Sequence, residues 1–232
     1  MHVEFRGQHC RHDDPRFPGA WTPNIDTLAL LQAILSVHDA EPVLRGRCLE
    51  VGCGNGFVAQ VLASAAPAVE EMHLMDVNPV SIASASDRLP SARGFRFHTG
   101  AAQQLMPTLG HFDLVVCNPP YVPHTSRLDT NEYEGVELIE HMVGLRKSWL
   151  RPGGSLVLLV SSVSMPRLRH LGLDESTCVY SRRVPFKVHA VVNDPEWLRE
   201  LLEEGEGIER DADPATSGYE YWQTLHVHRL GC

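Results

Sequence analysis

The chain has 232 residues, of which 43% are hydrophobic, and a formal net charge of −9 at pH 7. This size and composition predict one large domain, or one domain with an appendage. No apolar run approaches the roughly 18 residues that span a bilayer, and residues 1–11 contain no charged-then-apolar leader, so we expect a soluble, cytoplasmic protein. The negative charge argues against unguided binding to nucleic acid, because a basic surface usually supplies most of that affinity.

Residues 1–20 are predicted to form a polar N-terminal segment, loose and partly disordered, ahead of a single domain over residues 21–232. His9, Cys10 and His12 lie close together, but their spacing fits no standard zinc template and lacks a distant second pair of ligands. We therefore predict no metal site. The six cysteines include no C-x-x-C pair and are expected to be reduced thiols.

A helix is predicted soon after Trp21, because apolar residues recur at helical spacing over residues 28–35. Asp26 or Thr27 is expected to cap its N-terminus, since a short polar side chain can accept hydrogen bonds from the first free backbone N–H groups. A plain cap of this kind accounts for both residues without a ligand.

Three glycines at alternate positions, Gly52, Gly54 and Gly56, follow a short apolar run that contains Glu50. We interpret the run, residues 47–51, as a buried strand and the glycines as a tight turn into a helix, because glycine accepts positive φ and lets a ligand approach the backbone. The dinucleotide fingerprint G-x-G-x-x-G has its third glycine one residue later and binds a pyrophosphate, which an acid would repel. The compact spacing with the acid resembles motif I of class I S-adenosylmethionine-dependent methyltransferases, whose cofactor carries an ammonium and a sulfonium.

A second apolar run, residues 72–75, ends at Asp76. In βαβ nucleotide folds an acid at the end of the second strand accepts hydrogen bonds from the ribose hydroxyls, so we predict that Asp76 binds the cofactor ribose. The alternative role is the N-cap of the next helix, which Asn78 can perform equally well. A third strand is predicted at 95–98. In many of the class I methyltransferases that the motif resembles, an acid soon after this strand binds the adenine amino group. Residues 101–104 contain no acid, and the resemblance leaves a glutamine amide oxygen as the substitute.

A fourth apolar run, residues 112–117, delivers Asn118-Pro119-Pro120-Tyr121. Consecutive prolines cannot donate to a sheet, so they end the strand and leave carbonyl groups free to accept hydrogen bonds. The side-chain oxygen of Asn118 and the carbonyl of Pro119 can hold both N–H bonds of a planar nitrogen and turn its lone pair toward a methyl donor. Tyr121 can stack on the planar group. The simpler alternative is a strand followed by a proline-rich turn.

Together these motifs resemble the class I S-adenosylmethionine-dependent N-methyltransferases of the N-P-P-Y group, most closely the HemK-type protein glutamine-N5 methyltransferases. The resemblance covers roughly residues 20–161. It implies a doubly wound, seven-stranded Rossmann-like α/β sheet whose last strand is antiparallel. Residues 1–46 leave no room for the N-terminal helical domain with which bacterial HemK-type enzymes dock the release factor, so the substrate stays open.

The resemblance also implies roles for single residues. S-adenosyl-L-methionine is the expected cofactor, and the P-x-x-D-T segment at residues 23–27 is similar to one that lies over the methionine end of that cofactor. Asn118, Pro119 and Tyr121 are the expected catalytic residues, and Pro120 and Tyr121 are expected to contact the substrate. The expected cofactor-binding residues are Thr27, Glu50, Gly52, Gly54, Gly56, Asp76 and Asn118.

The C-terminal half continues the alternation of helices and strands. The predicted elements are a polar lip at 124–131, a helix at 134–150, a turn at 152–154, strands at 155–160 and 186–192, an insert at about 193–218 and a last strand at 219–230. His226 and His228 are interpreted as sheet residues. The one basic concentration, residues 167–187, is interpreted as scattered surface charge, and the alternative is a site for an anionic substrate.

Four functions remain in competition. The first is an N-methyltransferase acting on a planar nitrogen, in a protein glutamine amide or a small-metabolite amine. The second is an adenine N6 methyltransferase acting on RNA or DNA, which the net charge opposes and only the basic segment supports. The third is a catalytically silent subunit with the methyltransferase fold, and the intact N-P-P-Y motif argues against it. The fourth is a nicotinamide-dependent dehydrogenase. The sequence leaves the methyl acceptor and the oligomeric state open.

Overall fold

The structure is a computed structural model that describes residues 2–12, 14–89, 94–123, 135–186, 191, 193–203 and 207–232. The chain divides into two compact units. The first unit contains residues 1–118, 145–158 and 229–232, and the second contains residues 119–144 and 159–228. Among the described residues, every helix is too short or too polar to cross a lipid bilayer.

The first unit begins with an ordered hairpin. Strands β1 (His2–Phe5) and β2 (Gln8–Arg11) pair antiparallel, and the two turn residues, Arg6 and Gly7, have φ angles of 45° and 75°. Positive φ at both positions gives the turn that best matches the twist of two antiparallel strands. The expectation of a loose N-terminal segment is wrong for these residues, because the buried side chain of Cys10 anchors the hairpin.

Parallel strands form the core of the first unit in the order β5-β4-β3-β6-β7. Their bounds are β3 (Gly46–Val51), β4 (Val69–Asp76), β5 (Phe95–Thr99), β6 (Phe112–Cys117) and β7 (Leu150–Ser161). The strands predicted from the apolar runs are confirmed. Strand β7 is longer than predicted, because residues 152–154, expected to form a turn, belong to it; its pairing with β6 shifts register between Phe112 and Leu114.

The register of these strands brings three sequence motifs to one edge of the sheet. Val51 on β3 pairs with Met75 on β4 and with Cys117 on β6. The residues that follow these three are the first glycine of the glycine-rich turn, Asp76 and Asn118. They therefore leave the sheet side by side, as expected for the carboxyl ends of parallel strands.

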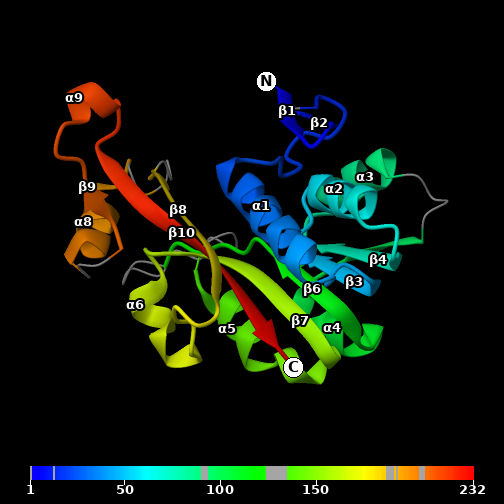
Figure 1. Cartoon of the computed structure of the whole chain (residues 1–232). Coiled ribbons are helices and arrows are strands. Elements are labelled where there is room, and N and C mark those ends of the chain that lie inside the picture. The colour runs from blue at the N-terminus through cyan, green and yellow to red at the C-terminus, as the bar shows by residue number, and fades with distance from the viewer. Residues whose placement is uncertain are drawn as a thin grey trace. The chain divides into compact units, whose positions relative to one another are not determined.

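Helices of the first unit lie on both faces of these strands, with α2 and α3 on one face and α4 on the other (Figure 1). Their bounds are α1 (Ile25–Ala40), α2 (Phe57–Ala65), α3 (Pro79–Arg88), α4 (Ala102–Leu109) and the 3₁₀ turn η2 (Arg146–Ser148). The N-cap of α1 is Asn24, whose side chain accepts hydrogen bonds from the backbone of Asp26 and Thr27. The expectation that Asp26 or Thr27 is the cap is wrong, because the extended backbone lies at Asn24 and both later residues are already helical.

The second unit contains the end of the sheet. Strand β10 (Tyr221–Gly231), whose last residues belong to the first unit, runs antiparallel to β8 (Cys178–Pro185) and β9 (Glu209–Arg210). The predicted α/β fold with an antiparallel last strand is confirmed. The short β9 adds a strand to the predicted seven in the described part of the sheet. The helices are α5 (Glu137–Gly144), α6 (Met165–Leu168), the 3₁₀ turn η3 (Arg169–Leu171), α8 (Pro195–Glu203) and α9 (Pro214–Ser217).

Several C-terminal predictions need correction or fall outside the described residues. The helix predicted over 134–150 ends at Gly144, and a 3₁₀ turn follows, because Leu145 leaves the helical conformation with a ψ of 9°. The predicted lip at 124–131 lies outside the described residues, as does most of the strand predicted at 186–192. The described strand β8 precedes the predicted strand and lies within the basic segment, residues 167–187, for which the sequence predicts scattered surface charge.

Candidate functional site

The glycine-rich turn after β3, residues 52–56, has the backbone that its spacing predicts. Gly52, Gly54 and Gly56 have φ angles of 72°, 51° and 76°. A Cβ on Gly54 would lie 2.8 Å from the carbonyl oxygen of Trp21, and one on Gly56 would lie 3.0 Å from Cβ of Ala85. At Gly52 such a Cβ would meet no described atom within 4 Å. Two of the glycines therefore allow the chain to pack on itself, whereas Gly52 faces space that a ligand could enter.

Glu50 is a buried acid beneath this turn. Its side chain is 5% exposed, and Oε2 accepts a hydrogen bond from the backbone N–H of Ala59 in the first turn of α2 at 3.0 Å. Burial raises the pKa of Glu50 well above its usual value, and the hydrogen bond from Ala59 opposes that rise. In this structure Glu50 holds the start of α2 against the turn.

The start of α2 also bears on the type of cofactor. The N–H of Phe57 donates to Asn55 Oδ1 at 3.3 Å, and the N–H of Ala59 donates to Glu50. A pyrophosphate on a dinucleotide turn binds such free N–H groups at the helix N-terminus. Because side chains of the chain itself occupy two of these donors, the local geometry argues against the dehydrogenase alternative.

Asp76 is the last residue of β4 and contacts the glycine-rich turn. Its Oδ2 accepts a hydrogen bond from the N–H of Gly54 at 2.9 Å, and its Oδ1 accepts one from the N–H of Asn78 at 2.9 Å. Burial raises the pKa of Asp76. Asn78 is the N-cap of α3, with its side chain accepting from the N–H of Val80, so the alternative role of Asp76 as the cap is excluded. A carboxylate offers about four lone-pair sites, so it can accept from a further donor beside these backbone N–H groups.

Asn118 lies at the end of β6 with its two amide atoms in different surroundings. Its Nδ2 donates to Thr27 Oγ1 at 3.5 Å. Its Oδ1 is buried and has no hydrogen-bond partner among the described residues. The Thr27 hydroxyl is held in turn by Asn24, since it donates to Asn24 Oδ1 at 3.1 Å and accepts from the N–H of Asn24 at 3.3 Å. The structure thus brings together Thr27 and Asn118, and the capping box of α1 orients the amide.

Tyr121 belongs to the second unit and is 9% exposed. Its hydroxyl accepts a hydrogen bond from Gln223 Nε2 at 3.4 Å, and Gln223 Oε1 accepts one from Ser161 Oγ at 2.6 Å. Gln223 and Ser161 are buried polar residues that the sequence reasoning missed. The available signal was weak, because Ser161 closes an apolar strand and Gln223 lies in a strand with several other polar residues. Only a small part of the Tyr121 ring is left for the predicted stacking on a substrate. Pro119 is buried and Pro120 is half-buried.

Part of the positive charge of the basic segment, residues 167–187, is paired with other side chains of the chain. Arg183 pairs with Glu209 at 2.8 Å and lies over the ring of Trp222, 4.2 Å from its centroid. Lys187 lies outside the described residues. His226 and His228 lie on β10, as predicted. Within the described ranges, no group of three or more His, Cys, Asp or Glu side chains is arranged to hold a metal ion.

Comparison with known proteins gives a consistent family. The sequence model of the methyltransferase small domain family matches residues 25–175. A relative named ribosomal RNA small subunit methyltransferase C, from Pasteurella multocida, is 32% identical over 192 residues, which are 79% of this chain and 53% of the relative. A Methanocaldococcus jannaschii protein, named as a candidate protein N5-glutamine methyltransferase, is 23% identical over 76% of this chain and 91% of its own length.

A solved structure shows the same fold. The ribosomal protein L11 methylase of Lactobacillus delbrueckii subsp. bulgaricus superposes with a TM-score of 0.50 at 16% identity, over 91% of this chain and 82% of that one. The chain spans about half the length of the Pasteurella multocida relative, since the aligned 192 residues cover 53% of it.

Proposed function

The chain belongs to the methyltransferase small domain family, and we propose that it is an S-adenosylmethionine-dependent enzyme that methylates a planar nitrogen, in a protein glutamine amide or a small-metabolite amine. The observation that carries the proposal is the buried Oδ1 of Asn118, which has no partner among the described residues. A buried acceptor without a partner costs about 1–3 kcal/mol. An N–H group of the methyl acceptor would satisfy it.

The cofactor supplies an electrophilic methyl group on a sulfonium, and the chain positions the nitrogen that attacks it. A planar nitrogen is a poor nucleophile, because its lone pair is delocalised into the neighbouring π-system. Asn118 Oδ1 and the carbonyl of the adjacent Pro119 are proposed to accept both N–H bonds and to stabilise the positive charge that develops on the nitrogen. Thr27 maintains the orientation of Asn118, and Tyr121 with Pro120 contacts the planar group.

The proposed cofactor contacts come from the first unit. A Cβ on Gly52 would meet no described atom within 4 Å, which supports a close approach of the cofactor to the backbone there. Asp76 is proposed to accept from the ribose hydroxyls with its remaining lone pairs. Gly54, Gly56 and Glu50 shape the turn, and Thr27 borders the methionine end.

Ribosomal RNA is the alternative acceptor class, because a relative at 32% identity is named for it. An exocyclic amine of a base is also a planar nitrogen, so the same pair of acceptors would serve. The net charge of −9 and the pairing of Arg183 with Glu209 argue against this class. The protein glutamine class has the support of the M. jannaschii relative, of which this chain covers 91%.

Transfer of a labelled methyl group tests the proposal. The wild-type protein and Asn118→Ala are incubated with methyl-labelled S-adenosylmethionine and, in separate reactions, release factors, ribosomal RNA and cell extract. We expect wild-type labelling of protein or small molecules and almost none with the variant. Labelling of RNA alone would select the alternative class. A wild-type protein that binds cofactor without labelling any acceptor would favour the silent subunit, and absence of cofactor binding in calorimetry would reject both enzyme functions.

A further inference from the structure

The residue between the last two glycines, Asn55, is bonded through all its polar groups. Its backbone N–H donates to the carbonyl of Trp21 at 2.9 Å, and its carbonyl accepts from Arg88 Nε at 2.9 Å. Its side chain accepts from the N–H of Phe57 at 3.3 Å and donates to Cys10 Sγ at 3.0 Å. The conformation of the glycine-rich turn is therefore set largely by segments that are distant in the sequence.

Arg88 joins these segments. It is the last residue of α3, where a cation also interacts favourably with the helix dipole. Besides the carbonyl of Asn55, it donates to the His9 carbonyl at 3.2 Å, to Gln60 Oε1 at 3.3 Å and to Cys10 Sγ at 3.4 Å. One guanidinium group thus bridges the N-terminal hairpin, α2 and the glycine-rich turn, using the several donors that arginine holds in a fixed plane.

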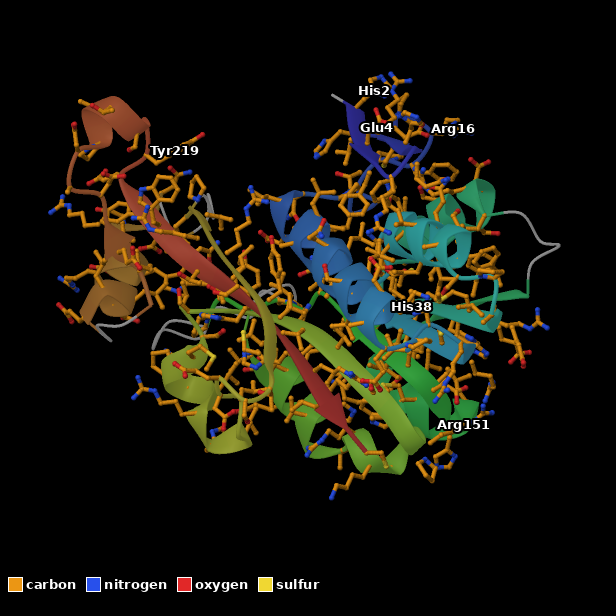
Figure 2. All side chains as sticks on the ribbon, viewed as in Figure 1. His2, Glu4, Arg16, His38, Arg151 and Tyr219 are labelled. Carbon is orange, nitrogen blue, oxygen red and sulfur yellow. The ribbon has the colours of Figure 1, made fainter. Side chains whose placement is uncertain are left out.

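A second contact fastens the N-terminal segment to α3. Arg16, which follows the hairpin, pairs with Asp87 at 3.0 Å and with Asp14 at 2.8 Å. Figure 2 shows Arg16 in the same corner of the first unit as His2 and Glu4 of the hairpin. The pair is exposed and contributes little by itself. Asp87 directly precedes Arg88 in the sequence, so the pair joins the segment after the hairpin to the end of α3.

We propose that the N-terminal hairpin is part of the cofactor-binding apparatus and that Arg88 is its positioning residue. The inference rests on the proposed function, since it concerns the same cofactor turn. The hairpin and Arg88 hold Asn55, and hence Gly54 and Gly56, in the conformation that receives the cofactor. A turn that is already ordered loses less conformational freedom on binding, so affinity increases without a direct contact to the ligand.

Cofactor titration by calorimetry on the full chain tests the inference. Arg88→Met keeps an unbranched side chain similar to the aliphatic part of arginine and removes its hydrogen bonds. We expect S-adenosylmethionine to bind this variant about tenfold or more weakly, on the scale of losing a charged hydrogen bond. Arg88→Lys retains the charge and is expected to recover part of the affinity.

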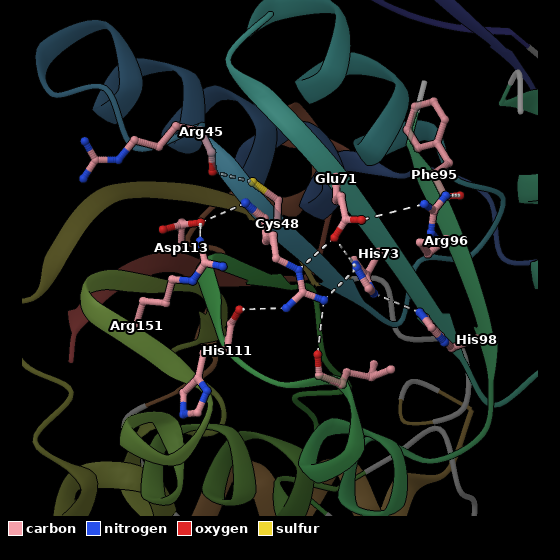
Figure 3. Close-up of polar contacts among 12 residues, drawn as sticks. Arg45, Cys48, Glu71, His73, Phe95, Arg96, His98, His111, Asp113 and Arg151 are labelled. Carbon is pink, nitrogen blue, oxygen red and sulfur yellow. Dashed lines mark hydrogen bonds and ion pairs between the residues drawn. The ribbon is translucent and has the colours of Figure 1, made fainter. Parts of the chain in front are cut away.

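Arg47 provides a matched control. Its side chain also makes four polar contacts, to Glu71, to His73 and to the carbonyls of Leu109 and His111. Figure 3 shows Glu71, His73 and His111 of this group. Arg47 lies at the start of β3, at the opposite end of the strand from the turn. Arg47→Met is expected to lower the melting temperature as Arg88→Met does and to leave cofactor affinity within about twofold of wild type, because it does not contact the turn. An equal loss of cofactor affinity in both variants, or no loss in Arg88→Met, would overturn this inference and leave the proposed function intact.

Hydrogen exchange on the wild-type protein supplies a test that needs no stable variant. By linkage, a cofactor that depends on the hairpin must also stabilise the hairpin. Adding S-adenosylmethionine is expected to slow amide exchange in residues 8–11 as well as in residues 52–56. Slower exchange in the turn with no change in the hairpin would contradict the inference, and a wild-type protein that does not bind the cofactor would remove the proposed function together with it.

Discussion

Asn118 Nδ2 donates to Thr27 Oγ1 at 3.5 Å, although 91 residues separate the two in the chain. The contact joins the end of a central strand to the first turn of α1. It decides which atom of the Asn118 amide is engaged by the protein and which is left for a ligand. Because Thr27 is itself fixed by the capping box with Asn24, the orientation of a proposed catalytic group depends on how a helix begins.

Substitution of Thr27 tests this dependence. Thr27→Val preserves the shape of the side chain but removes the hydroxyl that contacts Asn24 and Asn118. We expect the free energy of unfolding to fall by about 1 kcal/mol, as for loss of a helix cap. Methyl transfer should fall further than cofactor affinity, because the Asn118 amide can then rotate. Thr27→Ser retains the hydroxyl and should keep the free energy of unfolding and methyl transfer near wild type. If it does not, the Thr27 hydroxyl is not what orients Asn118.

Removal of the amide itself should affect chemistry more than binding. Asn118→Ala is expected to leave cofactor affinity within a few-fold of wild type and to reduce turnover by roughly 10²-fold or more, on the scale of losing one oriented polar group at a developing charge. Titration calorimetry and the labelled-methyl assay measure the two effects separately. Turnover equal to that of wild type would contradict the catalytic assignment.

The sequence predicted the parts of the site that are local. The glycine spacing and the acid closing the second strand were sufficient to place the turn and Asp76 at one sheet edge, because parallel strands end together. The choice of Asn24 as the cap was not predictable, since Asn24, Asp26 and Thr27 can all cap a helix and only the backbone distinguishes them. The N-terminal hairpin was missed because its turn has positive φ at Arg6, where the sequence has no glycine.

Contacts between strands that are distant in the chain were also not predictable from the sequence. Ser161 closes β7, Gln223 is one of several polar residues of β10, and nothing local in the sequence connects them with Tyr121. Their hydrogen bonds depend on where β10 and the last residues of β7, 159–161, lie within the second unit. The sequence shows that Gln223 and Ser161 are polar, but it does not show that they bond each other or Tyr121.

Asp76 tests the cofactor contact. Asp76→Ala is expected to weaken S-adenosylmethionine binding by about 1–3 kcal/mol, the range for losing hydrogen bonds to a charged group. Part of the loss comes from the bonds that Asp76 accepts from Gly54 and Asn78, so Asp76→Asn is the better-matched variant, since it keeps the shape and one acceptor. Calorimetry should give intermediate affinity for Asp76→Asn. Affinity unchanged in both variants would reject the ribose role.

Gln223 should act through the Tyr121 hydroxyl. Gln223→Met removes both side-chain hydrogen bonds, and we expect the free energy of unfolding to fall by about 1–3 kcal/mol, because buried partners lose their hydrogen bonds. Labelled-methyl turnover should fall while cofactor affinity stays constant. In the Tyr121→Phe background the same substitution should cost less, which a double-mutant cycle measures. Ser164→Ala, another buried serine of the second unit, is the control for stability alone.

His228 makes the stability of the protein depend on pH. Its side chain is 2% exposed, and its Nδ1 lies 2.9 Å from Thr177 Oγ1. Burial, with a smaller contribution from repulsion by His226, lowers the pKa of His228 from 6.5 to about 4, and Asp174 opposes the shift. The folded chain therefore binds this proton at lower pH than the unfolded chain does.

The contribution of neutral His228 to stability is complete above pH 6.5 and is lost as the pH falls toward 4. One pKa unit corresponds to about 1.4 kcal/mol, so this side chain accounts for a loss of roughly 3 kcal/mol across that window. Urea unfolding between pH 4 and pH 7 should give a shallower pH dependence for His228→Gln, which cannot be protonated there, than for wild type. Equal slopes for the two proteins would show that His228 is not the group that titrates.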